Sequence, residues 1–158
     1  MNYGYFDQER REYVITRPDT PTPWINYLGD AQGFAGIISN MAGGTAFYKD
    51  PQHLRVLRQR INAFPVDRPG RYLYVKDMDS GEVFSPMWQP VMEDLDHYEC
   101  RHGMGYTTIS GTRFGITAEV RYFVPQGKDY ELWTASLTNN TKNTRRLKIF
   151  SFAFIYHL

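Results

Sequence analysis

The feature that most constrains how this chain can fold is an alternation of apolar and polar side chains in its second half. The clearest stretch is GITAEVRYFVP, residues 115–125. One face of this stretch, if extended, would carry Ile116, Ala118, Val120, Tyr122 and Val124. The other face would carry Thr117, Glu119 and Arg121, with Phe123 as the exception. Side chains two residues apart share a face of a strand, so the pattern predicts a half-buried β-strand.

Neighbouring segments have the same character and are separated by turn residues. YELWTASLTNN places Trp133, Ala135 and Leu137 on a common face. RYLYVKDMDSGEVFS indicates a hairpin that turns at residues 79–81. YTTISGTRFGITAEV indicates a second return, at either 110–111 or 114–115. Several strands at regular spacing, with Gly, Pro and Asn turns between them, predict an antiparallel β-sandwich.

A single segment shows helical spacing. DPQHLRVLRQRI, residues 50–61, has apolar side chains at Leu54, Leu57 and Ile61. Asp50 would cap this helix and a proline would occupy its first turn. The predicted fold class is therefore all-β, with at most one short helix.

Length and composition narrow the function classes. A chain of 158 residues is long enough for one domain and too short for two ordinary ones. A net charge of +1 gives no electrostatic case for nucleic acid or an anionic membrane as partner, and no apolar run reaches the length of a membrane span. A single cysteine, Cys100, and the absence of an apolar signal region predict a reducing, cytoplasmic location.

Two segments stand outside the alternating pattern. KIFSFAFIYHL, at the end of the sequence, is apolar on both faces. It is either a central strand buried within this domain or a strand that further parts of the natural domain would cover. YVITRPDTPTPWINYLG, residues 13–29, contains three prolines and indicates an extended, ordered crossing rather than a core element. We expect it to strap the N-terminus against the rest of the molecule, so that proteases would not cut readily between Pro18 and Pro23.

The densest polar and aromatic cluster is HYECRHGMGY, residues 97–106. The favoured interpretation is a strand leading into a glycine-rich turn, with Arg101 paired to a nearby acid. Arg101 and His102 are the candidates for contact with a substrate. A metal site is not favoured, because the two histidines are five residues apart and Cys100 would point away from His97 in a strand. Nor is a Cys100 nucleophile, which would need a base held beside it.

Other side chains could carry chemistry but have simpler interpretations. The loop acids Glu93, Asp94, Asp96 and Glu99 could include a general acid, although loop acids are usually only solvated. The tryptophans could stack on the apolar face of a sugar ring, although a core role is favoured for each; they are Trp24, Trp88 and Trp133. DMDSGE is no calcium loop, because Trp88 stands where the bidentate glutamate would be. NMAGGTAFY is neither a phosphate loop nor a dinucleotide fingerprint.

Six stretches in the same order cover nearly the whole chain and carry a family resemblance. They are YGYFDQERREYVITRPDTPTPWINYLG, IISNMAGGTAFYKD, DRPGRYLYVKDMDSGEVFSPMWQPV, YECRHGMGYTTISG, FVPQGKDYELW and LTNNTKNTRRLKIFSF. They resemble the N-terminal part of glycoside hydrolase family 94, formerly glycosyltransferase family 36, which includes cellobiose phosphorylase. YECRHGMGYT resembles the cellobiose branch most. DRPGRYLYVKDMDSGEVFSPMWQPV resembles the chitobiose and cellobionic acid branches equally, so the branch stays open.

The resemblance implies a fold and a reaction. Residues 1–158 would form an N-terminal β-sandwich, supersandwich-like and galactose-mutarotase-like, that is incomplete at its C-terminal end. Family members cleave a β-linked disaccharide with inorganic phosphate and invert the anomeric centre. Phosphate is the nucleophile, so one general acid suffices, whereas an inverting hydrolase would also need a base. No metal or organic cofactor is implied, and members are typically homodimers.

The resemblance also implies what is missing. The general acid is an Asp in a following (α/α)₆ barrel, which this sequence does not contain, so no catalytic residue can be assigned here. After FSF the family usually continues VEFCLW, whereas this sequence reads AFIYHL, which suggests a truncated chain.

Three hypotheses follow. The chain is the N-terminal portion of a glycoside phosphorylase, with cellobiose as the favoured substrate, and is inactive alone. Alternatively, it is a free-standing carbohydrate-binding module, or one half of a split enzyme that assembles with a separately encoded barrel. The isolated chain is expected to be poorly soluble because of its apolar final segment.

Overall fold

A computed structural model of the protein describes residues 2–30, 32–57 and 70–155. These residues form thirteen strands that pair antiparallel, and none of the described residues is helical. The described residues therefore contain no helix that could span a membrane.

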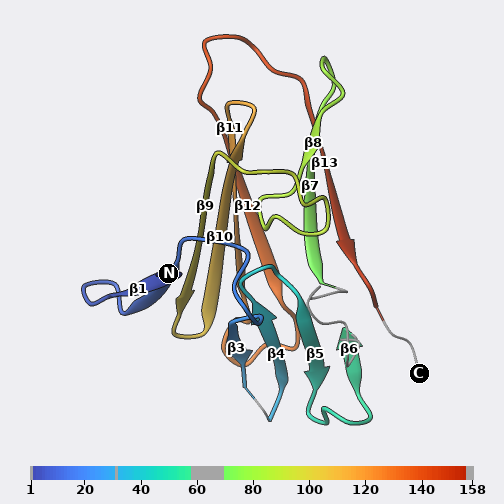
Figure 1. The fold of residues 1–158 in the computed structure, drawn as a ribbon. Coiled ribbons are helices and arrows are strands. Elements are labelled where there is room, and N and C mark those ends of the chain that lie inside the picture. Colours follow the sequence, from blue (N-terminus) through green and yellow to red (C-terminus); the bar gives the residue numbers. More distant parts are fainter. Residues whose placement is uncertain (1, 31, 58–69, 156–158) are drawn as a thin grey trace.

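The first layer is a six-stranded sheet. Its strands, in spatial order, are β1 (Gly4–Asp7), β2 (Glu12–Ile15), β9 (His97–Gly103), β10 (Tyr106–Arg113), β11 (Ile116–Phe123) and β12 (Leu132–Asn139). The strands from β9 to β12 form a meander of hairpins, seen in Figure 1 from olive to orange. The sheet ends at β12 on one side.

The second layer consists of two smaller sheets. One has the order β3 (Ile25–Gly29), β4 (Phe34–Ser39), β5 (Gly44–Tyr48) and β6 (Arg55–Leu57). The other has the order β13 (Leu147–Ala153), β7 (Arg71–Asp77) and β8 (Val83–Phe84). Two isolated bridges connect them, Gly43 to Gly70 and Leu57 to Ile155.

The core lies between the layers. The alternating face of β11 enters it as predicted, with Ile116, Ala118, Val120 and Tyr122 all at most 1% exposed. They pack with residues of the second layer, including Leu28, Ile38, Leu73 and Val75. Burial of these β-branched and aromatic side chains is the main force that holds the layers together.

Both predicted hairpins are present. β7 and β8 pair across the turn at residues 78–82, with Val75 opposite Phe84. Of the two places considered for the second turn, the chain uses Phe114-Gly115, and both residues have positive φ. Gly111 lies instead within β10, where an added Cβ would come within 2.5 Å of the Pro86 carbonyl oxygen.

The expected helix is not present in the described part of its segment. Asp50 caps a turn rather than a helix: its carboxylate accepts hydrogen bonds from the amides of Gln52 and His53. The turn covers residues 51–53, and β6 follows it and pairs with β5. Residues 58–61 of the prediction lie outside the described residues.

The final strand is not a buried central strand. β13 occupies a sheet edge, where it pairs with β7 alone among the named strands. Ile149 and Phe150, which point to opposite faces, are 48% and 50% exposed. The sequence allowed two interpretations of this strand. The first, a central strand buried within this domain, is therefore wrong.

Candidate functional site

Arg101 and His102, the two candidates from the sequence, point to opposite sides of β9. Arg101 lies among three carboxylates: Glu99 at 2.6 Å, Glu12 at 2.8 Å and Asp7 at 3.2 Å. The hydrogen bonds that Arg101 donates to Glu99 and Glu12 raise the pKa of its guanidinium. Arg101 thus pairs with acids, as the structural interpretation expected, and links β9 to the β1–β2 hairpin.

One of these acids is itself buried. Glu12 is 6% exposed and also accepts a hydrogen bond from the Tyr106 hydroxyl. Burial alone would raise the pKa of Glu12, but the hydrogen bonds from Tyr106 and Arg101 outweigh it, so the pKa is lowered. The cluster is a partly buried ionic network in which Arg101 and Glu12 each bond to more than one partner.

His102 is equally engaged. Its Nε2 lies 3.0 Å from the Trp24 carbonyl oxygen, which can only accept, so Nε2 carries the proton. Its Nδ1 lies 2.9 Å from the Thr107 hydroxyl and accepts from it. Burial lowers the pKa of His102, which favours the neutral ring. A substrate-binding role for Arg101 or His102 stays a prediction. Neither residue lines the cleft described below.

Cys100 lies on the core side of β9 and is 0% exposed. Burial raises the pKa of its thiol well above the ordinary value, which is the opposite of what a thiolate nucleophile needs. Within the described ranges, no three potential metal-ligating side chains come together.

The loop acids divide into paired and unpaired groups. Arg113 holds Glu93 at 2.6 Å and Asp96 at 3.0 Å, while Glu99 holds Arg101. Asp94 forms no hydrogen bond or ion pair with any residue that the structure describes. Asp94 is therefore the one acid of the four whose carboxylate is available to a ligand.

The tryptophans divide in a similar way. Trp24 packs against Tyr13 at 5.6 Å between ring centres. Trp133 packs against Tyr122 at 5.7 Å and donates its indole N–H to Glu131 at 2.7 Å. The core role favoured for these two is confirmed. Trp88 is half-buried and borders a cleft.

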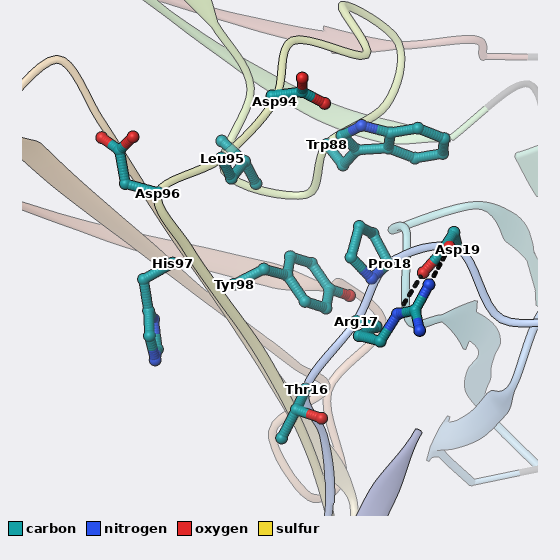
Figure 2. A pocket seen from close by; sticks show the side chains of 10 residues that line it. All are labelled: Thr16, Arg17, Pro18, Asp19, Trp88, Asp94, Leu95, Asp96, His97 and Tyr98. Atoms are coloured by element: carbon teal, nitrogen blue, oxygen red, sulfur yellow. Dashed lines mark hydrogen bonds and ion pairs between the residues drawn. The ribbon is translucent and has the colours of Figure 1, made fainter. Parts of the chain in front are cut away.

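This cleft, the candidate functional site, lies between two connections that pass from one layer to the other (Figure 2). One wall is the start of the β2–β3 connection, residues 16–19, and the other is the β8–β9 connection with the start of β9, residues 88 and 94–98. Its volume is about 510 Å³. Pockets of this size are typical of small-molecule sites.

Asn40 holds the first wall in place. Its side-chain amide donates to the Pro18 carbonyl oxygen at 3.1 Å, and its side-chain oxygen accepts from the Trp24 amide at 3.0 Å. The hydroxyl of Tyr98, in the cleft, donates to the Asn40 carbonyl oxygen. These bonds hold residues 18–24 in place. The two ends of residues 13–29 belong instead to β2 and β3, where Val14, Ile15 and Leu28 are buried, so the expectation that this segment contributes nothing to the core is wrong. The strapping role stays a prediction.

Arg17 and Asp19 line the same wall and were not singled out from the sequence. They form a two-point ion pair, with Nε–Oδ1 at 3.0 Å and Nη2–Oδ2 at 2.6 Å (Figure 2). The Arg17 guanidinium also lies 5.2 Å from the centre of the Tyr3 ring. A sequence signal was present in the RPD triplet, but nothing in the sequence placed it opposite Trp88.

Comparison with known proteins shows which family this chain resembles, which the geometry alone does not. The model of the family "Glycosyl hydrolase 94, supersandwich domain" matches residues 11–157. An N,N'-diacetylchitobiose phosphorylase of Vibrio proteolyticus is 47% identical over 154 residues, which cover 96% of this chain and 19% of that protein. A solabiose phosphorylase of Paenibacillus borealis is 37% identical over 158 residues, which cover 95% of this chain and 20% of that protein.

A more distant relative is a cellobionic acid phosphorylase of Neurospora crassa, 30% identical over 81 residues, or 51% of this chain and 10% of that protein. The chain spans about a fifth of the length of the first two relatives. The expected resemblance and the supersandwich fold are thereby confirmed, whereas a cellobiose specificity is not.

Proposed function

Because the chain belongs to the glycosyl hydrolase 94 family through its supersandwich domain, we propose that it is the N-terminal β-sandwich of a disaccharide phosphorylase. The observation that carries this proposal is the collinear match to phosphorylases, at 47% identity over nearly the whole chain. At that level the match reflects a shared fold rather than a chance likeness.

The proposed reaction is phosphorolysis of a β-linked disaccharide with inversion, giving a sugar 1-phosphate and a free sugar. Inorganic phosphate is the nucleophile and attacks the anomeric carbon. The glycosidic C–O bond breaks, and a general acid protonates the leaving oxygen. No metal or organic cofactor takes part in this proposal.

The general acid is proposed to lie outside this chain. A general acid needs a carboxyl group that is protonated and open to substrate. Glu12 and Glu99 are committed to Arg101, and Glu93 and Asp96 to Arg113. Asp94 is open, but it is exposed to solvent, and the family resemblance places the general acid in a barrel outside this chain. The chain alone should therefore be inactive.

Two substrates deserve direct comparison. The relatives at 47% and 46% identity act on N,N'-diacetylchitobiose, which supports an N-acetylglucosamine disaccharide. The resemblance of YECRHGMGYT to the cellobiose branch supports a glucose disaccharide. Dimerisation, a cytoplasmic location and assembly with a separately encoded barrel remain proposals beside these.

The deciding experiment is a phosphorolysis assay that follows release of sugar 1-phosphate. The chain would be assayed with phosphate and either disaccharide, first alone and then with a barrel-containing fragment of the Vibrio enzyme. We expect no turnover alone and turnover on complementation, with one disaccharide preferred. Turnover by the chain alone would refute the proposal; Asp94→Asn would then show whether Asp94 is the acid. Failure of the pair to turn over either sugar, despite co-purifying, would count against a phosphorylase role.

A further inference from the structure

We propose that the cleft bounded by residues 16–19 and 88–98 is a carbohydrate-binding site in its own right, with the Trp88 indole as the platform on which a sugar ring stacks. The site would bind sugar whether or not the parent protein is a phosphorylase, so it stands apart from the proposed reaction.

The first argument is the way in which the chain presents Trp88. Its two neighbours, Met87 and Gln89, are 0% and 1% exposed, so the core anchors the backbone on both sides. Between them Trp88 has a φ of 66°, in the left-handed region that a bulky residue rarely adopts. This conformation keeps the indole out of the core and at the cleft (Figure 2).

The loop that carries Trp88 also packs tightly against strand β10. The neighbouring Pro86 packs so closely on Gly111 of β10 that no Cβ would fit between them. A strained aromatic residue on a rigid support is the arrangement found at ligand clamps, because the support holds the ring in place before the ligand arrives.

The second argument is a pair of unused polar groups at the cleft. The indole N–H of Trp88 has no hydrogen-bond partner within the described part of the chain, and neither has the Asp94 carboxylate. Both side chains line the same cleft (Figure 2). One is a donor and the other an acceptor, which suits a sugar because each hydroxyl can both accept and donate.

The charge of the cleft selects among ligands. Three carboxylates line it; Asp19 is paired with Arg17 and Asp96 with Arg113, so Asp94 carries the charge that no arginine balances. Phosphate and sugar phosphates would be repelled, so the site suits a neutral sugar. A pyranose with equatorial hydroxyls, such as a β-linked glucose unit, offers an apolar C–H face that matches the indole face.

The remaining walls are fixed without ligand. Arg17 and Asp19 hold each other, and Asn40 fixes the backbone at Pro18. Binding therefore orders few additional groups, which lowers the cost of association.

The test is a titration of this chain with cellobiose, N,N'-diacetylchitobiose and inorganic phosphate. Ligand-observed saturation-transfer NMR suits it, because the method tolerates self-association of the protein. We expect at least one disaccharide to bind with a Kd on the order of 1 mM, a weak affinity, and phosphate neither to bind nor to compete.

Three variants decide whether the cleft is responsible. Trp88→Ala should weaken binding at least about tenfold, and Asp94→Asn, which preserves size and leaves the fold untouched, should weaken it severalfold. Tyr27→Ala removes an aromatic side chain that is 67% exposed outside the cleft and should change nothing. Thermal melting of each variant confirms that it is folded.

Binding that survives both Trp88→Ala and Asp94→Asn overturns the proposal, as does the absence of binding by wild-type protein to either disaccharide. The outcome is separate from the phosphorolysis assay, because complementation can succeed with Trp88→Ala and sugar can bind to a chain that supports no turnover.

Discussion

At the scale of single residues, adjacent positions of β9 have opposite surroundings. Arg101 faces three carboxylates, whereas His102 faces a carbonyl oxygen and a hydroxyl on the other side of the sheet. The two-residue period of the strand causes this difference. A charged side chain is stabilised on one face, and a neutral imidazole on the other.

His102 should make the stability of the protein depend on pH. Its folded-state pKa lies below the ordinary value of 6.5, so below that pH the unfolded chain binds a proton that the folded chain does not. The free energy of unfolding should therefore be constant above about pH 6.5 and fall at lower pH, by at most about 1.4 kcal/mol per pH unit for one proton. Urea denaturation between pH 7.5 and pH 5, roughly the range in which histidine titrates, measures it.

Measurement between pH 7.5 and pH 5, roughly the range in which histidine titrates, also separates the contribution of His102 from that of the carboxylates. Glu12 and Asp77 have lowered pKa values and lose their stabilising contribution only below their ordinary values of 4.5 and 3.8. His102→Gln should abolish the slope, and His97→Gln, at an exposed site on the same strand, should leave it. An unchanged slope in His102→Gln would show that another group is responsible.

At the scale of elements, the two outer strands of the layers are the least covered parts of the fold. β12 ends the large sheet, and β13 ends one small sheet. Besides Ile149 and Phe150, the exposed large apolar residues here are Leu132, Phe152, Phe154 and Ile155. An apolar strand with a free edge offers backbone hydrogen bonds and side-chain contacts to any second strand.

The isolated chain should therefore self-associate through β13. Phe150→Lys places a charge on the exposed edge and leaves the core intact, so it should raise the proportion of monomer without lowering the melting temperature. Sedimentation velocity over a range of protein concentrations measures this. Phe6→Lys, at a residue that is 71% exposed on β1, is the matched control. A wild-type chain that stays monomeric at every concentration and melts cooperatively would contradict the prediction.

At the scale of the whole molecule, one buried ion pair joins all three sheets. Arg71 at the start of β7 is 0% exposed and bonds Glu131, just before β12, at 2.5 and 2.9 Å. Its guanidinium also donates to the carbonyl oxygens of Ile37 and Thr45, on β4 and β5, at 3.1 and 3.0 Å. The fork of donors that arginine offers is what allows one side chain to reach three sheets.

Breaking this pair should be more costly than breaking any surface pair. Glu131→Gln keeps the shape but leaves the Arg71 charge buried without a counter-charge, which should cost about 3–5 kcal/mol of folding free energy. Asp79→Asn breaks the exposed pair with Arg146 and should change stability little. Urea denaturation of both variants compares them. Equal midpoints would mean that the buried pair contributes no more than the surface pair.

The sequence by itself determined the fold class, the strand that β11 became, both hairpins and the family. Each depends on local information. Side-chain alternation determines which face of a strand is buried, turn residues determine where a hairpin turns, and motifs in the same order identify the family. The same local reading failed at residues 50–57, where helical spacing was overridden by pairing of β6 with β5, and it left the fate of the final strand open.

Only the tertiary structure decided which side chains meet. Arg71 and Glu131 are 60 residues apart, and the cleft joins residues near position 17 to residues near position 90. Trp88 looked like Trp24 and Trp133 in the sequence, yet of the three it is Trp88 that lines the cleft. Long-range contacts depend on how the layers stack, and neither periodicity nor spacing along the chain contains that information, because both describe a single element at a time.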